Sequence, residues 1–74
     1  MSIENKLDDL LRDYSYELHC SVLEEVYHAK DERLTKMFSI VVDYHTLKGF
    51  MVKEEVLNDY ILRYNELRYE DGQD

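Results

Sequence analysis

The chain contains no proline, and its only glycines are Gly49 and Gly72. Proline and glycine are the residues that most strongly end helices and form turns. From Ile3 to Lys48, therefore, no residue forces a helix to stop, and breaks between helices must be predicted from the spacing of apolar residues. Gly49 is the clear interior boundary. This pattern favours an all-α fold.

Apolar residues follow helical spacing in three segments. The first begins after Ser2, a possible N-cap, and carries Ile3, Leu7, Leu10, Leu11, Tyr14, Leu18 and Val22. The third carries Val56, Leu57, Tyr60, Ile61, Tyr64 and Leu67. The middle segment carries Leu34, Met37, Phe38, Ile40, Val41, Val42, Tyr44 and Leu47. At about 100° per residue, these middle positions cover more than half of a helix circumference, so we expect this segment to form the centre of the core.

We predict a small three-helix bundle, with a single helical domain over residues 1–69 and a flexible acidic tail at 70–74. In this architecture the chain turns near Ala29 to Asp31, and Asp31 caps the second helix. In the alternative, residues 3–48 form one long coiled-coil-like helix paired in a dimer, and the third helix folds back after Gly49. A strand interpretation also exists, because residues 14–22 alternate and residues 39–42 are β-branched.

A second apolar stripe follows steps of four, three and four and comprises Tyr16, Cys20, Leu23 and Tyr27. On one continuous first helix it lies nearly opposite the face of Leu7 and Leu18. Either the other segments cover both faces within one bundle, or the stripe docks another chain. Lys30, Leu34, Met37, Val41 and Tyr44 continue the rhythm, which is typical of a coiled-coil seam. We predict a homodimer that uses this stripe.

Net charge is −8, from seventeen acidic and nine basic residues. The basic residues are scattered, which argues against direct nucleic-acid binding. We predict a second interaction surface for a basic protein partner on the third segment: Glu54, Glu55, Asp59, Glu66 and Tyr69, extended by Glu70 and Asp71. A sharper alternative is a DNA-mimic inhibitor of a nucleic-acid-binding protein.

Catalytic, cofactor and metal sites are not expected. Cys20 is the only cysteine, and the adjacent His19 points about 100° away on a helix, so we expect Cys20 to be buried filler. Glu25 and His28 have the spacing found in di-metal helical bundles, but a site would need a second copy, which leaves a dimeric metal-binding bundle as an alternative. We expect His45 to be a hydrogen-bonded histidine at the rim of the core.

The seven tyrosines are the most unusual feature of the composition. Tyrosine is favoured at interfaces, although it also fills cores. We expect Tyr60 and Tyr64 to lie inside and Tyr16, Tyr27 and Tyr69 to be exposed. A chain of this size buries only about 60% of its unfolded surface, which favours association. The sequence therefore predicts a non-catalytic protein–protein interaction module, either an adaptor or an inhibitor or regulator of another protein. No apolar run approaches the roughly 20 residues of a membrane span, and no secretory signal opens the chain, so a cytoplasmic location is expected.

Overall fold

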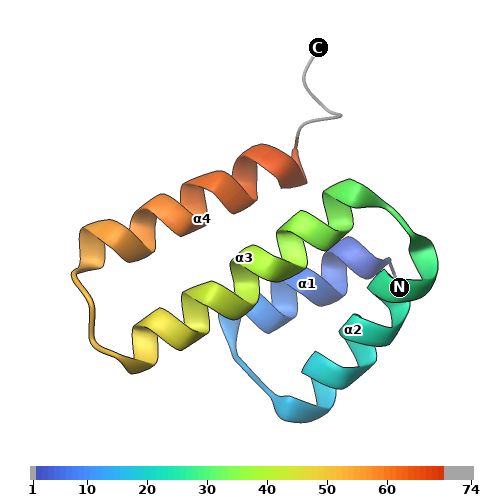
Figure 1. Cartoon of the computed structure of the whole chain (residues 1–74), viewed down its shortest axis with the longest axis horizontal. Coiled ribbons are helices and arrows are strands. Elements are labelled where there is room, and N and C mark those ends of the chain that lie inside the picture. Colours follow the sequence, from blue (N-terminus) through green and yellow to red (C-terminus); the bar gives the residue numbers. More distant parts are fainter. Residues whose placement is uncertain (1, 70–74) are drawn as a thin grey trace.

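The computed structural model describes residues 2–69, and this range contains four helices and no strand. In chain order they are α1 (Ile3–Arg12), α2 (Tyr16–Ala29), α3 (Glu32–Gly49) and α4 (Glu54–Arg68) (Figure 1). The all-α prediction is confirmed, and the strand interpretation is wrong. The tail predicted at residues 70–74 lies outside the described residues.

The prediction of three helices is wrong, because the first segment breaks at residues 13–15. Asp13 and Ser15 are both extended, with φ values of −149° and −141°. Ser15 caps α2 by accepting a hydrogen bond from the Leu18 amide at 3.4 Å. A serine side chain can replace the missing backbone partner at a helix start, so a helix can end and restart without proline or glycine.

The predicted turn before the middle segment is confirmed. Lys30 adopts a left-handed conformation with φ 52°, and Asp31 caps α3 by accepting hydrogen bonds from the amides of Arg33 at 2.9 Å and Leu34 at 3.4 Å. The alternative of one long helix over residues 3–48 is therefore wrong. Ser2 caps α1 as expected, because its hydroxyl accepts from the Asn5 amide at 3.1 Å.

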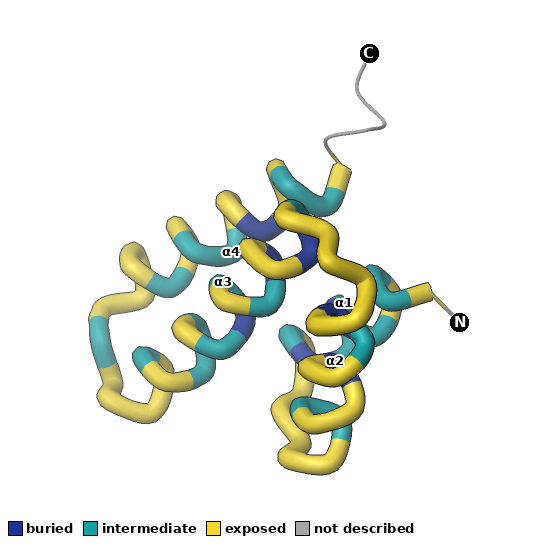
Figure 2. The backbone as a smooth tube through the Cα atoms, turned by 45° about the vertical axis from the view of Figure 1, so that its right-hand side comes forward, coloured by how far each residue is buried: buried dark blue, intermediate teal, exposed yellow. Residues whose placement is uncertain are grey.

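α3 is the central helix, as its broad apolar surface predicted. It packs against α1, α2 and α4, and α3 lies between α2 and α4 in Figures 1 and 2. The core draws on all four helices and consists of Leu7, Leu10, Val22, Val26, Leu34, Met37, Val41 and Tyr64.

Polar contacts fasten the C-terminal half of α4 to the rest of the molecule. The Tyr64 hydroxyl donates to an Asp8 carboxylate oxygen at 2.5 Å, and Arg68 Nε donates to both Asp8 oxygens at 3.2 Å. Arg33 donates to the Leu67 carbonyl at 2.7 Å and to the Glu4 carboxylate at 2.6 Å. These contacts join α4 to α1 and to the start of α3.

The outer half of the α3–α4 hairpin has no buried residue. We call residues 42–63 the distal hairpin. Apolar and aromatic side chains recur through it, yet each of its residues is half-buried or exposed, and Figure 2 shows this end in teal and yellow only. The core therefore stops at Val41 on α3 and at Tyr64 on α4.

Candidate interaction surfaces

The stripe of Tyr16, Cys20, Leu23 and Tyr27 lies on the outside of α2. Tyr16 is 75% exposed, Leu23 46% and Tyr27 72%, and Cys20 is also exposed. Val22 and Val26, on a different face of α2, are buried in the core. The interpretation in which the chain's own helices cover this stripe is therefore wrong, as is the expectation that Cys20 is buried filler. The stripe and Leu7 also belong to different helices, because the chain breaks between α1 and α2.

The aromatic rings of this α2 stripe, Tyr16 and Tyr27, contact neighbouring polar side chains. Tyr16 stacks on His19, with ring centroids 6.3 Å apart, and the His19 ring nitrogen Nδ1 is 3.1 Å from the Tyr14 hydroxyl. A hydrogen bond with the Cys20 thiol raises the pKa of Tyr16 above its ordinary value. At the other end, Tyr27 makes an edge contact with His28 at 5.5 Å. The exposed rings are thus supported from within their own helix and from the preceding loop.

The predicted acidic surface is exposed along α4: Glu54, Glu55, Asp59, Glu66 and Tyr69. Glu55, Asp59 and Glu66 follow steps of four and seven, which place them on one helical face. Cations are interleaved with these groups, because Arg63 pairs with Asp59 at 2.9 Å and the Arg68 guanidinium lies 5.2 Å from the centre of the Tyr69 ring. Sequence reasoning missed Leu62, which is 57% exposed on the same side and falls outside the core-facing periodicity.

Glu25 and His45, which the sequence singles out, form polar contacts with α1. In the described part of the chain, no three His, Cys, Asp or Glu side chains converge as metal ligands would. Glu25 forms an ion pair with Lys6 of α1. His45 is half-buried, and its Nε2 lies 2.8 Å from the Leu10 carbonyl, near the end of α1. The expectation of a hydrogen-bonded rim histidine is confirmed.

Tyr60 and Tyr64 differ in burial. Tyr64 belongs to the core, as predicted, and burial together with its hydrogen bond to Asp8 raises its pKa. Tyr60 is only half-buried and lies under the Arg63 guanidinium, 5.3 Å from the ring centre. The three tyrosines expected to be exposed, Tyr16, Tyr27 and Tyr69, are exposed.

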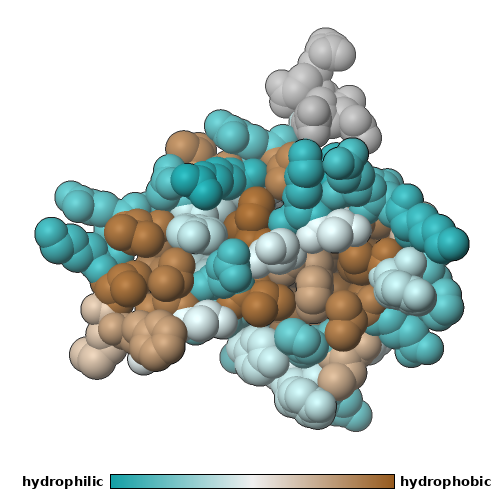
Figure 3. All heavy atoms as spheres, viewed as in Figure 1, coloured by the Kyte–Doolittle hydropathy of each residue, from teal (hydrophilic) through white to brown (hydrophobic). Residues whose placement is uncertain are grey.

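The α3–α4 loop forms an apolar tip that sequence reasoning did not single out. Phe50 is 73% exposed and Met51 90%. In Figure 3, apolar side chains gather over the end of the molecule that carries this loop. The available signal was the run Phe50-Met51-Val52 directly after Gly49, where a polar turn would be usual.

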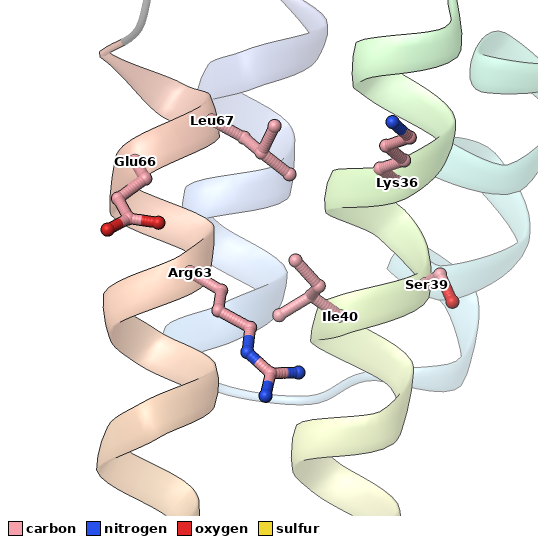
Figure 4. A pocket seen from close by; sticks show the side chains of 6 residues that line it. All are labelled: Lys36, Ser39, Ile40, Arg63, Glu66 and Leu67. Carbon is pink, nitrogen blue, oxygen red and sulfur yellow. The ribbon is translucent and has the colours of Figure 1, made fainter.

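A groove runs between α3 and α4, and we call it the hairpin groove. It has a volume of about 560 Å³ and is lined by Lys36, Ser39, Ile40, Arg63, Glu66 and Leu67. Figure 4 shows Ile40 and Leu67 projecting into the space between the helices, with Arg63 reaching towards α3. A smaller hollow of about 290 Å³ involves Asp43, Thr46, Leu47 and Tyr60. Because the α3 residues of both recur at steps of three and four, the two hollows lie on one flank of the hairpin.

Comparison with protein-family models, with curated proteins and with solved structures gives no match to this chain. Within residues 2–69, no helix combines the length and the apolar content needed to cross a membrane.

Proposed function

We propose that this protein is a non-catalytic interaction module, an adaptor or inhibitor that acts by docking the α2 stripe into a groove of another protein. The observation that carries this proposal is the exposure of all four stripe residues on a helix whose other face is buried. An amphipathic helix whose apolar anchors recur at steps of three and four suits helix-in-groove recognition. Tyr16 and Tyr27 supply large aromatic anchors at its two ends.

Charge beside the stripe indicates a basic partner. Glu17 and Glu24 are exposed and lie seven residues apart along one flank of the stripe. A second copy of the chain would bring the same acidic flank and the same net charge of −8. A groove with an apolar floor and a basic rim complements both features, so a foreign protein suits the α2 stripe better than a second copy does.

The test is affinity capture with immobilised protein from cells that express it. The bait is the wild-type chain, and the matched variants are the double substitution Leu23→Asp with Tyr27→Asp and the single substitution Phe50→Asp. Phe50 is 73% exposed in the α3–α4 loop, so it controls for loss of surface hydrophobicity outside the α2 stripe. We expect a partner that the wild type and Phe50→Asp retain and the double variant loses. Equal retention by all three baits, each shown to be folded by circular dichroism, would reject the α2 stripe.

The acidic face of α4 serves this proposal as a second contact for the basic partner. Replacement of Glu54 and Glu55 by Lys is expected to weaken binding of the captured partner roughly threefold to tenfold, because exposed ion pairs contribute little each. The measurement is titration calorimetry at low and high salt, and the effect of the replacement should shrink at high salt. Unchanged affinity at low salt would remove α4 from the interface.

A further inference from the structure

The distal hairpin is a pair of helices without a core of its own. None of residues 42–63 is buried, and Figure 2 shows where burial ends. Two helices can cover only one stripe of each other, so an apolar flank that continues past that stripe stays in water unless another chain covers it. Leu47 and Tyr60 form such a flank between the tip and the hairpin groove.

The same hairpin carries a protrusion and a hollow of matching chemistry. The tip presents Phe50 and Met51, the most exposed pair of neighbouring apolar residues in the described chain. The hairpin groove offers Ile40 and Leu67 on its walls and a volume of about 560 Å³, enough for both tip side chains. Ile40 lies on α3 and Phe50 directly follows its last residue, Gly49, so the two are about 15 Å apart along the helix axis.

Charges around the two features leave one complementary contact open. Lys36, Arg63 and Glu66 line the groove. Arg63 already pairs with Asp59, whereas Lys36 has no ion-pair partner in the described chain. Glu54 and Glu55 follow the tip at the start of α4, and Lys48 and Lys53 flank it. A tip that enters a groove would bring the two carboxylates near Lys36. The distal hairpin as a whole is nearly neutral, with three basic and four acidic residues, whereas the chain carries −8. Two copies therefore repel each other least at this surface.

We propose that two copies of this chain associate through their distal hairpins, side by side and antiparallel, with each tip seated in the hairpin groove of the other copy. A two-fold axis near the middle of the hairpin satisfies both contacts at once, which closes the assembly as a dimer and prevents growth into filaments. This inference goes beyond the proposed function, because it uses the α3–α4 hairpin and leaves the α2 stripe free for a foreign partner. The two proposals share only acidic residues of α4, so the α2 stripe and the tip are the surfaces that distinguish them. It also moves the predicted self-association from the α2 stripe to the hairpin.

The first measurement is sedimentation equilibrium over a wide range of concentrations. The wild type is expected to approach twice its 9.0 kDa mass. Phe50→Asp should weaken dimerisation at least about thirtyfold, as expected for loss of a central aromatic anchor. The α2 double variant Leu23→Asp with Tyr27→Asp should leave dimerisation unchanged, because the α2 stripe lies outside the hairpin. Conversely, Phe50→Asp should still retain the foreign partner, which separates this proposal from the proposed function.

The groove is tested by Ile40→Lys, which places an ammonium group among its walls and is expected to weaken the dimer as strongly as Phe50→Asp. Ile40 also packs against the core, so folding is checked by circular dichroism. If that variant does not fold, Lys36→Glu changes one exposed charge at the rim of the groove and should weaken the dimer about threefold.

Mixing the two variants gives the sharpest result. In a mixed dimer of Phe50→Asp with Ile40→Lys, the intact tip of one chain meets the intact groove of the other. We therefore expect the mixture to dimerise at concentrations where each variant alone is monomeric. A wild type that stays monomeric, a dimer that Phe50→Asp leaves intact, or a dimer that only the α2 variant abolishes would each overturn the proposal. A monomer whose tip instead binds phosphatidylcholine vesicles would assign the tip to a lipid surface and overturn it as well.

Discussion

Two residues other than glycine have a positive φ in the described chain, Lys30 at 52° and Met51 at 59°. A side chain with a Cβ pays about 1 kcal/mol or more in this left-handed region. Lys30 caps the C-terminus of α2, where its amide donates to the Val26 carbonyl at 3.3 Å. Met51 occupies the tip of the hairpin, where the same backbone conformation accompanies an almost fully exposed apolar side chain.

Lys30→Gly is expected to stabilise the fold by about 0.5 to 1 kcal/mol, because glycine adopts the left-handed cap without strain. Denaturant unfolding should show a higher midpoint with an unchanged slope. Lys36→Gly, in the interior of α3, is the matched control and should destabilise by about 1 kcal/mol. A lower midpoint for Lys30→Gly would show that the lysine side chain itself stabilises this turn.

Tyr64 makes stability depend on alkaline pH. Burial, followed by the hydrogen bond to Asp8, raises the pKa of Tyr64 above its ordinary value of 10.0. The folded state thus keeps a proton that the unfolded chain loses, so this contribution is complete below about pH 10 and decreases as pH rises further. Tyr64→Phe should lower stability at neutral pH and flatten its alkaline decline. The measurement is the free energy of unfolding against pH, and parallel profiles for both proteins would contradict the prediction.

At the scale of elements, the four helices differ in how their N-termini are capped. Ser2, Ser15 and Asp31 cap α1, α2 and α3 with side-chain hydrogen bonds, whereas Lys53 stands at the start of α4 without one. α4 compensates through tertiary contacts at its other end, where Tyr64 and Arg68 bind Asp8. Its N-terminal half belongs to the distal hairpin and is the least supported part of the fold.

Lys53→Ser is expected to stabilise the protein by about 0.5 to 1 kcal/mol, because the backbone at this position is already extended and a hydroxyl can accept an orphan amide of the first turn. Thermal unfolding is best measured in the Phe50→Asp background, which removes the proposed association. Asp31→Ala should lower stability by about 1 kcal/mol in the same assay. A neutral result for Lys53→Ser would mean that the start of α4 is frayed in solution.

At the scale of the whole molecule, the net charge opposes association between copies of the chain, whereas the exposed apolar surface favours it. The net charge of −8 separates copies of the chain, while the α2 stripe and the tip expose aromatic and aliphatic groups. Because salt screens repulsion over about 10 Å at 0.1 M, the balance between them depends on ionic strength.

If the two copies meet at the nearly neutral distal hairpin, dimerisation should strengthen as salt rises, since screening removes repulsion between the remaining acidic surfaces. Sedimentation equilibrium at low and high sodium chloride measures this change directly. A dimer that weakens at high salt would indicate that ion pairs, rather than the apolar tip and groove, hold the copies together.

Apolar spacing alone indicated that the chain is helical and that α3 is its centre, and Asp31 favoured a helix start that the structure confirms. These features depend on interactions within a few turns of helix, which the order of residues specifies directly. The same local periodicity predicted that the four residues of the α2 stripe lie together on one helical face.

Only the tertiary structure decided that residues 13–15 separate two helices and that Cys20, Phe50 and Met51 are exposed. Helical spacing runs through the break without a change of phase, so periodicity could not locate it. Exposure of an apolar side chain depends on which other helices reach it. In this chain Val41 is the last residue of α3 that belongs to the core. The tip lies beyond Val41, and its apolar side chains stay exposed.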